Sequence, residues 1–172
     1  MPSTADKGDV PPQIKAGLPR RLLPVAQLVP AGRSVADVGT GDGKLAAWLA
    51  AAGHRVIATE NKPGPRVEAL RLLGPLGIEC RLGDGLEPLL PGEVEVAVIA
   101  GMGGRTIGRI LAGSPEVVAA LEALVLQPMQ HGEELLADLL DRGYRLSGRV
   151  DVEQRSRVYS ALLVLPPYSI AR

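Results

Sequence analysis

Aromatic residues are nearly missing from this sequence of 172 residues, which has no phenylalanine, one tryptophan and three tyrosines. Aliphatic residues and alanine must therefore build its core, and hydrophobic residues still make up 46% of the chain. That share excludes a chain that is disordered throughout, because its apolar surface can offset the entropy lost on folding. Cys80 is the only cysteine, so the sequence has neither a disulfide framework nor a zinc site of paired cysteines.

An excess of either charge is also missing, since 19 basic residues balance 19 acidic ones. The balance excludes a broadly basic nucleic-acid binder of the histone type, but it leaves room for a local basic face. No apolar run approaches the roughly 20 residues that span a membrane. Asp6, Lys7 and Asp9 stand where a secretory signal would have its apolar core. We therefore expect a cytoplasmic protein with no membrane partner.

A metal site is not expected either, because no histidine–carboxylate cluster in the sequence has the spacing of metal ligands.

Short β-rich runs alternate with helix-forming runs along most of the chain. We predict a flexible tail over residues 1–12 and one domain over residues 13–168. Strands are predicted over residues 34–38, 55–59, 78–82, 93–100 and 124–127. Helices are predicted over residues 22–29, 44–52, 66–73, 105–112 and 133–142, and a further helix is predicted to begin at residue 114. Two longer β-rich runs, 144–152 and 158–165, have no helix between them and predict an antiparallel hairpin at one edge. The alternation predicts an α/β fold of three layers, a mostly parallel seven-stranded sheet covered on both faces.

A glycine-rich loop, Asp37-Val-Gly-Thr-Gly-Asp-Gly43, separates a predicted strand from the helix after it. In such sheets ligands bind beyond the carboxyl ends of the strands, and Gly39 and Gly41 let the backbone approach a ligand closely. A dinucleotide fingerprint reads G-x-G-x-x-G and receives a pyrophosphate. Here the spacing is G-x-G-x-G after an acidic residue, which suits a cationic ligand such as S-adenosylmethionine. The alternative is a set of turn glycines that binds nothing.

Two more acidic residues follow neighbouring predicted strands. Glu60 is placed to hold the ribose hydroxyls of such a ligand, and Asp84 can accept a hydrogen bond from the exocyclic amine of adenine. The alternatives are an exposed glutamate at a strand end and a plain Asp-Gly turn. We therefore predict S-adenosylmethionine as the cofactor. Its predicted binding residues are Asp37, Gly39, Thr40, Gly41, Glu60, Asn61, Gly83, Asp84, Gly85, Gly101, Met102 and Gly103.

A second glycine loop, residues 101–104 (GMGG), follows the strand predicted over 93–100, a position that faces the reacting group in such sheets. Its glycines let a flat substrate lie against the backbone, and Met102 offers a polarizable contact. Arg105 and Arg109 lie four apart on the next predicted helix, so both can face one side, toward phosphates or toward solvent. The predicted substrate-binding residues are Gly104, Arg105, Arg109 and Pro128.

Four segments together resemble the bacterial tRNA (adenine-22-N1)-methyltransferase family: residues 37–39 (DVG), 81–86 (RLGDGL), 98–104 (VIAGMGG) and 126–128 (LQP). The resemblance covers about residues 18 to 165. It implies a class I, Rossmann-like methyltransferase fold and methyl transfer from S-adenosylmethionine to N1 of an adenine in tRNA. N1 carries a free lone pair, so catalysis would rest on alignment in a desolvated polar pocket, with the base unpaired or flipped out. The catalytic candidates are Asp42, which would orient the exocyclic amine, and Gln127, which would line the base pocket.

The sequence departs from the family's pattern in three ways. Gly41-Asp42 stands where the family has Asp-His, with Lys44 in place of a tyrosine, and Met129 replaces an asparagine. The family also carries a C-terminal helical domain implicated in tRNA docking, whereas this chain ends at Arg172.

These departures leave the manner of tRNA docking open. A tRNA would have to be held by local basic groups, by a homodimer or by a partner protein. The local basic residues are Lys15, Arg20, Arg21, Arg105, Arg109, Arg155 and Arg157. Two other functions stay open, a methyltransferase of small molecules or proteins and a non-catalytic cofactor-binding module that acts through a partner protein.

Overall fold

The computed structural model describes residue 14 and residues 17–167. The predicted tail over residues 1–12 and the basic residue Lys15 lie outside the described residues. None of the helices in the described part is long and apolar enough to cross a membrane.

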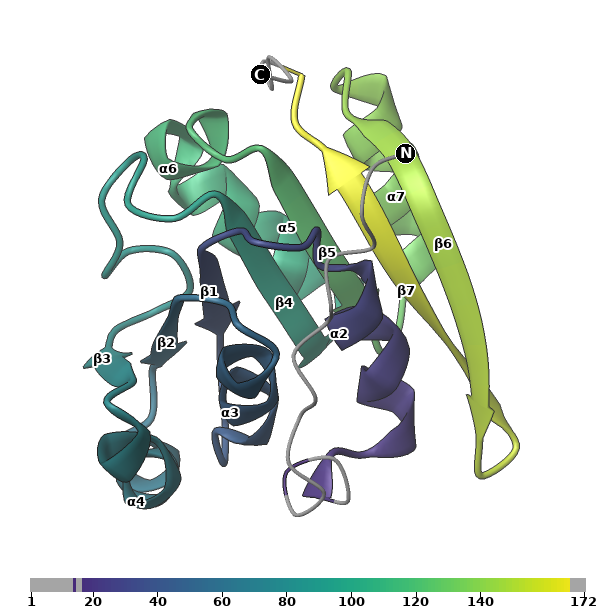
Figure 1. Ribbon diagram of the computed structural model, residues 1–172. Coiled ribbons are helices and arrows are strands. Elements are labelled where there is room, and N and C mark those ends of the chain that lie inside the picture. The colour runs from purple at the N-terminus through teal and green to yellow at the C-terminus, as the bar shows by residue number, and fades with distance from the viewer. Residues whose placement is uncertain (1–13, 15–16, 168–172) are drawn as a thin grey trace, which may run out of the picture.

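Seven strands form one sheet in the order β3-β2-β1-β4-β5-β7-β6 (Figure 1). They are β1 (Val35–Val38), β2 (Val56–Glu60), β3 (Glu79–Leu82), β4 (Val96–Met102), β5 (Ala123–Pro128), β6 (Arg145–Gln154) and β7 (Arg157–Leu165). The first five are parallel, and β7 is antiparallel to both β5 and β6. The prediction of a mostly parallel seven-stranded sheet with an antiparallel hairpin at its edge is confirmed. The strand order reverses between β1 and β4, which is where open α/β sheets bind ligands.

Helices cover both faces of this sheet (Figure 1). One face carries α2 (Leu23–Leu28), α3 (Lys44–Ala51) and α4 (Pro63–Leu73). The other carries α5 (Gly104–Gly113), α6 (Pro115–Ala119) and α7 (Gly132–Asp141). Two short 3₁₀ helices, η1 (Arg20–Leu22) and η2 (Gly74–Leu76), precede α2 and follow α4.

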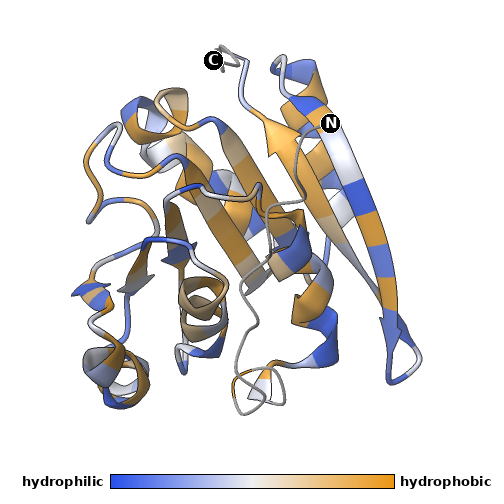
Figure 2. Cartoon of the chain, in the orientation of Figure 1, coloured by the Kyte–Doolittle hydropathy of each residue, from blue (hydrophilic) through white to orange (hydrophobic). Residues whose placement is uncertain are grey.

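Alternate residues of the central strands enter two separate cores. In β4, Val96 and Val98 pack into the core beneath α2, α3 and α4, while Ala97 and Ile99 pack into the core beneath α5, α6 and α7. The central strands are accordingly hydrophobic along their length (Figure 2). Both cores are almost wholly aliphatic, as the scarcity of aromatic residues predicts.

Two predicted boundaries were wrong for identifiable reasons. The strand predicted from residue 93 begins at Val96, because the carboxylates of Glu93 and Glu95 bond to Arg81 and Ser34. The helix predicted from residue 66 begins three residues earlier at a proline, since the first helical turn needs no N–H donor.

Candidate functional site

A cavity of about 300 Å³ opens at the carboxyl ends of β1 to β4. It brings together most of the predicted cofactor residues, which come from four different loops. The predicted residues that line it are Gly39, Gly41, Glu60, Asn61, Gly83, Asp84, Gly85, Gly101, Met102 and Arg109. Lys62, Pro65, Ala100, Thr106 and Ile110 complete the lining. Asp37, Thr40 and Gly103, predicted with this group, lie outside the lining.

A second cavity of about 330 Å³ lies between α5, α6 and α7, at the other end of the sheet. Its walls are mainly apolar, and it contains none of the residues that the sequence predicts for the site. The cavity at the carboxyl ends is therefore the candidate site.

The loop after β1 needs its glycines for two reasons. Gly39, Gly41 and Gly43 have φ angles of 68°, 60° and 80°, in the left-handed region that side chains rarely adopt. A Cβ at Gly39 would also collide with the Cε methyl of Met102. The loop after β1 and the last residue of β4 therefore approach one another closely across the cavity.

Asp37 lies beneath this loop and is 2% exposed. Its Oδ2 accepts a hydrogen bond of 2.6 Å from the Thr40 hydroxyl, and its carboxylate accepts the Ala46 N–H. Burial raises the pKa of Asp37 to about 6, and the negative charges of Asp42 and Glu60 add to the rise, while the two hydrogen bonds oppose it. Asp37 thus supports the loop from below and favours a cation near it.

Glu60 reaches into the cavity although it is only 6% exposed. Its Oε2 accepts the Gly41 N–H at 3.0 Å and its Oε1 accepts the Lys62 N–H at 3.1 Å. A carboxylate has about four acceptor sites, so Glu60 retains capacity for two hydroxyl donors of a ligand. The same two bonds fix its position relative to the glycine loop.

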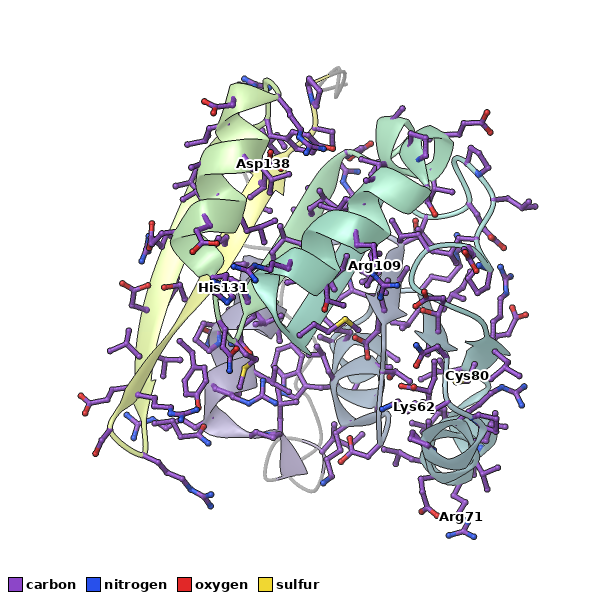
Figure 3. All side chains as sticks on the ribbon, turned by 180° about the vertical axis from the view of Figure 1, so that it is seen from behind. Lys62, Arg71, Cys80, Arg109, His131 and Asp138 are labelled. Carbon is purple, nitrogen blue, oxygen red and sulfur yellow. The ribbon has the colours of Figure 1, made fainter. Side chains whose placement is uncertain are left out.

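Asp84 lies at the rim of the cavity. Its Oδ1 accepts a hydrogen bond of 3.4 Å from Asn61 Nδ2, and its Oδ2 is 3.7 Å from Arg109 Nη1. Figure 3 shows Arg109 on α5. Arg105 turns to another neighbour, Glu134 of α7, with 3.9 Å between Nη2 and Oε2. The structure therefore brings Arg109 to the cavity and does not bring Arg105 there.

Neither catalytic candidate is among the residues that line the cavity. Asp42 is exposed, and its carboxylate bonds to Lys44 through the N–H at 3.2 Å and through Nζ at 2.9 Å. Gln127 is 0% exposed. Its Oε1 accepts a hydrogen bond of 2.7 Å from Arg21 Nη1, and its Nε2 donates one of 2.6 Å to the Arg21 carbonyl oxygen.

Arg21 is the residue whose place sequence reasoning missed. Its backbone N–H donates to Gln154 Oε1 of β6 at 2.9 Å, so η1 is attached to both β5 and β6. A Cβ added at Gly101 would lie 3.6 Å from Arg21 Nη2, which places the guanidinium against a residue of the cavity wall. The basic pair at positions 20 and 21 is a weak signal, and nothing in the sequence connects it to these strands.

The other predicted substrate residues join the loops after β4 and β5. The Gly104 N–H donates to the Gln130 carbonyl at 2.7 Å, and a Cβ at Gly104 would collide with the carbonyl oxygen of His131 at the start of α7 (Figure 3). Pro128 lines a separate cavity of about 170 Å³ beside β7. Both residues lie outside the lining of the main cavity.

Among the described residues, no group of three or more histidine, cysteine, aspartate or glutamate side chains is arranged to hold a metal ion.

Comparison with known proteins gives the same assignment from sequence and from structure. A family model described as a methyltransferase domain matches residues 18–162. The tRNA (adenine(22)-N(1))-methyltransferase of Bacillus subtilis (strain 168) is 34% identical over 153 residues, which are 85% of this chain and 64% of that protein. The chain therefore spans slightly less than two thirds of the length of this relative.

A solved structure from Streptococcus pneumoniae, proposed to be a tRNA (m1A22) methyltransferase, superimposes with a TM-score of 0.82 at 33% identity. The match covers 87% of this chain and 70% of that one. A second structure of the same protein, in complex with S-adenosyl-L-methionine, also has a TM-score of 0.82 and 33% identity, over 87% of this chain and 73% of that one.

Proposed function

Because the chain belongs to the tRNA (adenine-22-N1)-methyltransferase family, we propose that it transfers the methyl group of S-adenosylmethionine to N1 of an adenine in tRNA. The observation that carries the proposal is the cavity in which Glu60 and Asp84 meet the two glycine loops. A tRNA substrate also implies that the protein works in the cytoplasm.

The residues of the cavity fit this cofactor. Glu60 would hold the ribose hydroxyls, Asp84 the adenine amine, and Met102 would contact the sulfonium end across from Gly39. A Cβ at Gly39 would meet the terminal methyl of Met102, so the loop there lies close to this side chain. When bound, the cofactor supplies a methyl group that is made electrophilic by a positively charged sulfur.

The protein's part in the reaction is mainly alignment. N1 of adenine has its own lone pair, so no side chain has to remove a proton before N1 attacks the methyl carbon. Residues 101–103 lie exposed or half-buried at the end of β4 and offer backbone against which a flat base can lie. Asp42 and Gln127 are not among the residues that line the cavity, and they bond to Lys44 and Arg21, so this proposal gives neither the role of a base. The target base must leave its helix, because N1 lies on the Watson–Crick edge.

A methyl-transfer assay on unmodified tRNA tests the proposal. The full chain, labelled S-adenosylmethionine and tRNA should give labelled 1-methyladenosine, found by mass spectrometry of the digested RNA. The modified base should also stop reverse transcription at one adenine. The control is the same tRNA with that adenine replaced by guanine, which should stay unlabelled. Label at another atom, or in no tRNA, would contradict the proposal.

A non-catalytic cofactor-binding module is the second candidate, because both polar atoms of the buried Gln127 are already occupied by Arg21. This module would act through a partner protein or as a homodimer. Binding of S-adenosylmethionine without methyl transfer to tRNA, small molecules or proteins would support it over the enzyme.

A further inference from the structure

Arg21 carries a charge that no carboxylate balances among the described residues. Its side chain is half-buried, and its guanidinium bonds only to the neutral amide of Gln127, at 2.7 Å. Arginines withdrawn from solvent usually pair with a carboxylate or a phosphate, because losing hydration without a counter-charge is costly. The described residues therefore supply no counter-charge for this guanidinium, which leaves it able to bind an anionic group of a ligand.

The bonds around Arg21 hold it in place for such an anion. Gln127 both accepts from the guanidinium and donates to the Arg21 carbonyl, and Gln154 accepts from the Arg21 N–H. Three elements, η1, β5 and β6, therefore fix one residue. The guanidinium lies against Gly101, whose φ of 77° lets the chain turn at the cavity wall.

The charges around the cavity leave one end without a cation. Lys62 and Arg109 are the basic residues of the lining, and they lie near Glu60 and Asp84, the residues proposed for the adenosine part of the cofactor. The amino-acid part would then extend toward Gly39 and Gly101. S-adenosylmethionine ends there in an α-carboxylate, and no basic side chain of the lining stands at that end.

We propose that the Arg21 guanidinium binds the α-carboxylate of the cofactor, and that Gln127 is the positioning residue that aims it. This inference rests on the proposed function, because it assigns a ligand group to the same cavity. Gln127 accepts from Nη1 of the guanidinium and leaves other N–H groups of Arg21 available. Because the Gln127 amide is neutral, it holds the Arg21 side chain without neutralising the positive charge of the guanidinium. A phosphate of the target nucleotide would offer similar chemistry, and the experiment below separates the two sources.

Calorimetry with three ligands tests the assignment. S-adenosylhomocysteine keeps the α-carboxylate, whereas 5′-methylthioadenosine lacks the whole amino-acid end, and decarboxylated S-adenosylmethionine lacks the carboxylate alone. In Arg21→Met, the affinity for S-adenosylhomocysteine should fall about 10- to 100-fold, the usual loss for a charge-assisted hydrogen bond. In the same variant, the affinities for the two ligands without the carboxylate should change less than about twofold. The control is Arg71→Ala, which removes an exposed arginine on the outer side of α4 (Figure 3) and should change all three affinities less than about twofold.

A second variant keeps the test valid if Arg21→Met does not fold. Gln127→Glu has nearly the same shape and gives Arg21 a carboxylate of its own, so it should weaken S-adenosylhomocysteine and spare 5′-methylthioadenosine. A merely structural role of Gln127 would weaken both ligands equally, and that result would overturn the proposal. An unchanged affinity for S-adenosylhomocysteine with a raised KM for tRNA would overturn it in favour of a phosphate. Wild-type protein that binds none of these ligands would instead refute the proposed function.

Discussion

Replacing Asp37 by asparagine should stabilise the fold at neutral pH. The carboxylate is buried beneath the first glycine loop, and its pKa is raised from 3.8 to about 6. The folded protein therefore holds this proton more tightly than the unfolded chain, so the free energy of unfolding falls as pH rises from about 4 to about 6 and stays low above that. A shift of about two pKa units corresponds to roughly 3 kcal/mol.

Asparagine removes the charge while keeping the shape and the hydrogen-bonding reach to Thr40. We expect Asp37→Asn to exceed the wild type by about 1–3 kcal/mol at pH 8, with the difference shrinking as pH falls through about 6 toward 4. Urea unfolding of both proteins at several pH values measures the difference, and subtracting the two curves cancels the other titrating groups.

The same substitution should weaken cofactor binding, because the carboxylate no longer attracts the ammonium group of the ligand. Calorimetry at pH 8 measures this loss. Parallel stability curves for the two proteins, with no narrowing between pH 8 and pH 4, would refute the argument from burial.

Three other substitutions test the site and its support. Glu60→Gln should lower the affinity for S-adenosylhomocysteine about 10-fold or more in calorimetry, because an amide has too few acceptors for two backbone N–H groups and a ribose; an unchanged affinity would remove Glu60 from the site. Gly39→Ala should cost about 1–2 kcal/mol in urea unfolding, mainly because a side chain strains the left-handed φ of 68°, whereas the terminal methyl of Met102 can move aside; a cost near zero would mean that the loop moves freely. Arg81 holds the pKa of Glu93 down to about 2, so this pair stabilises the protein above about pH 4.5 and loses that effect as pH falls toward 2. Arg81→Met should therefore lower the free energy of unfolding by about 1–2 kcal/mol at pH 7. Between about pH 4.5 and pH 2, the free energy of unfolding of the variant should fall less steeply than that of the wild type, and an equally steep fall would contradict this.

The sequence predicts local features of this protein well. Periodicity identifies the strands and helices, and the glycine loops show which strand ends carry the cavity. Glu60 and Asp84 could be placed there because parallel strands end at one edge, so residues far apart in the chain meet by topology alone.

The sequence does not predict which of several possible partners a polar side chain bonds to. The run EVEVAVIA first alternates like a strand and then becomes fully apolar, yet Glu93 and Glu95 bond to Arg81 and Ser34, and the strand starts at Val96. Gln127 could be expected in the base pocket, but its bonds join it to Arg21 of a 3₁₀ helix that lies 106 positions away in the chain. Tertiary packing determines such pairs, so they cannot be predicted from the spacing of residues in the sequence.

The bond between the Arg21 N–H and Gln154 joins residues 133 positions apart in the chain. The hairpin that carries Gln154 projects beyond the carboxyl edge of the sheet (Figure 1), and it is synthesised after the first five strands. A ribosome-bound chain can complete β1 to β4 while η1 still lacks this anchor. Long-range closure of this kind is a slow step of folding. A newly made chain should therefore form the cavity at the ends of β1 to β4 before β6 and β7 hold Arg21 in place beside it.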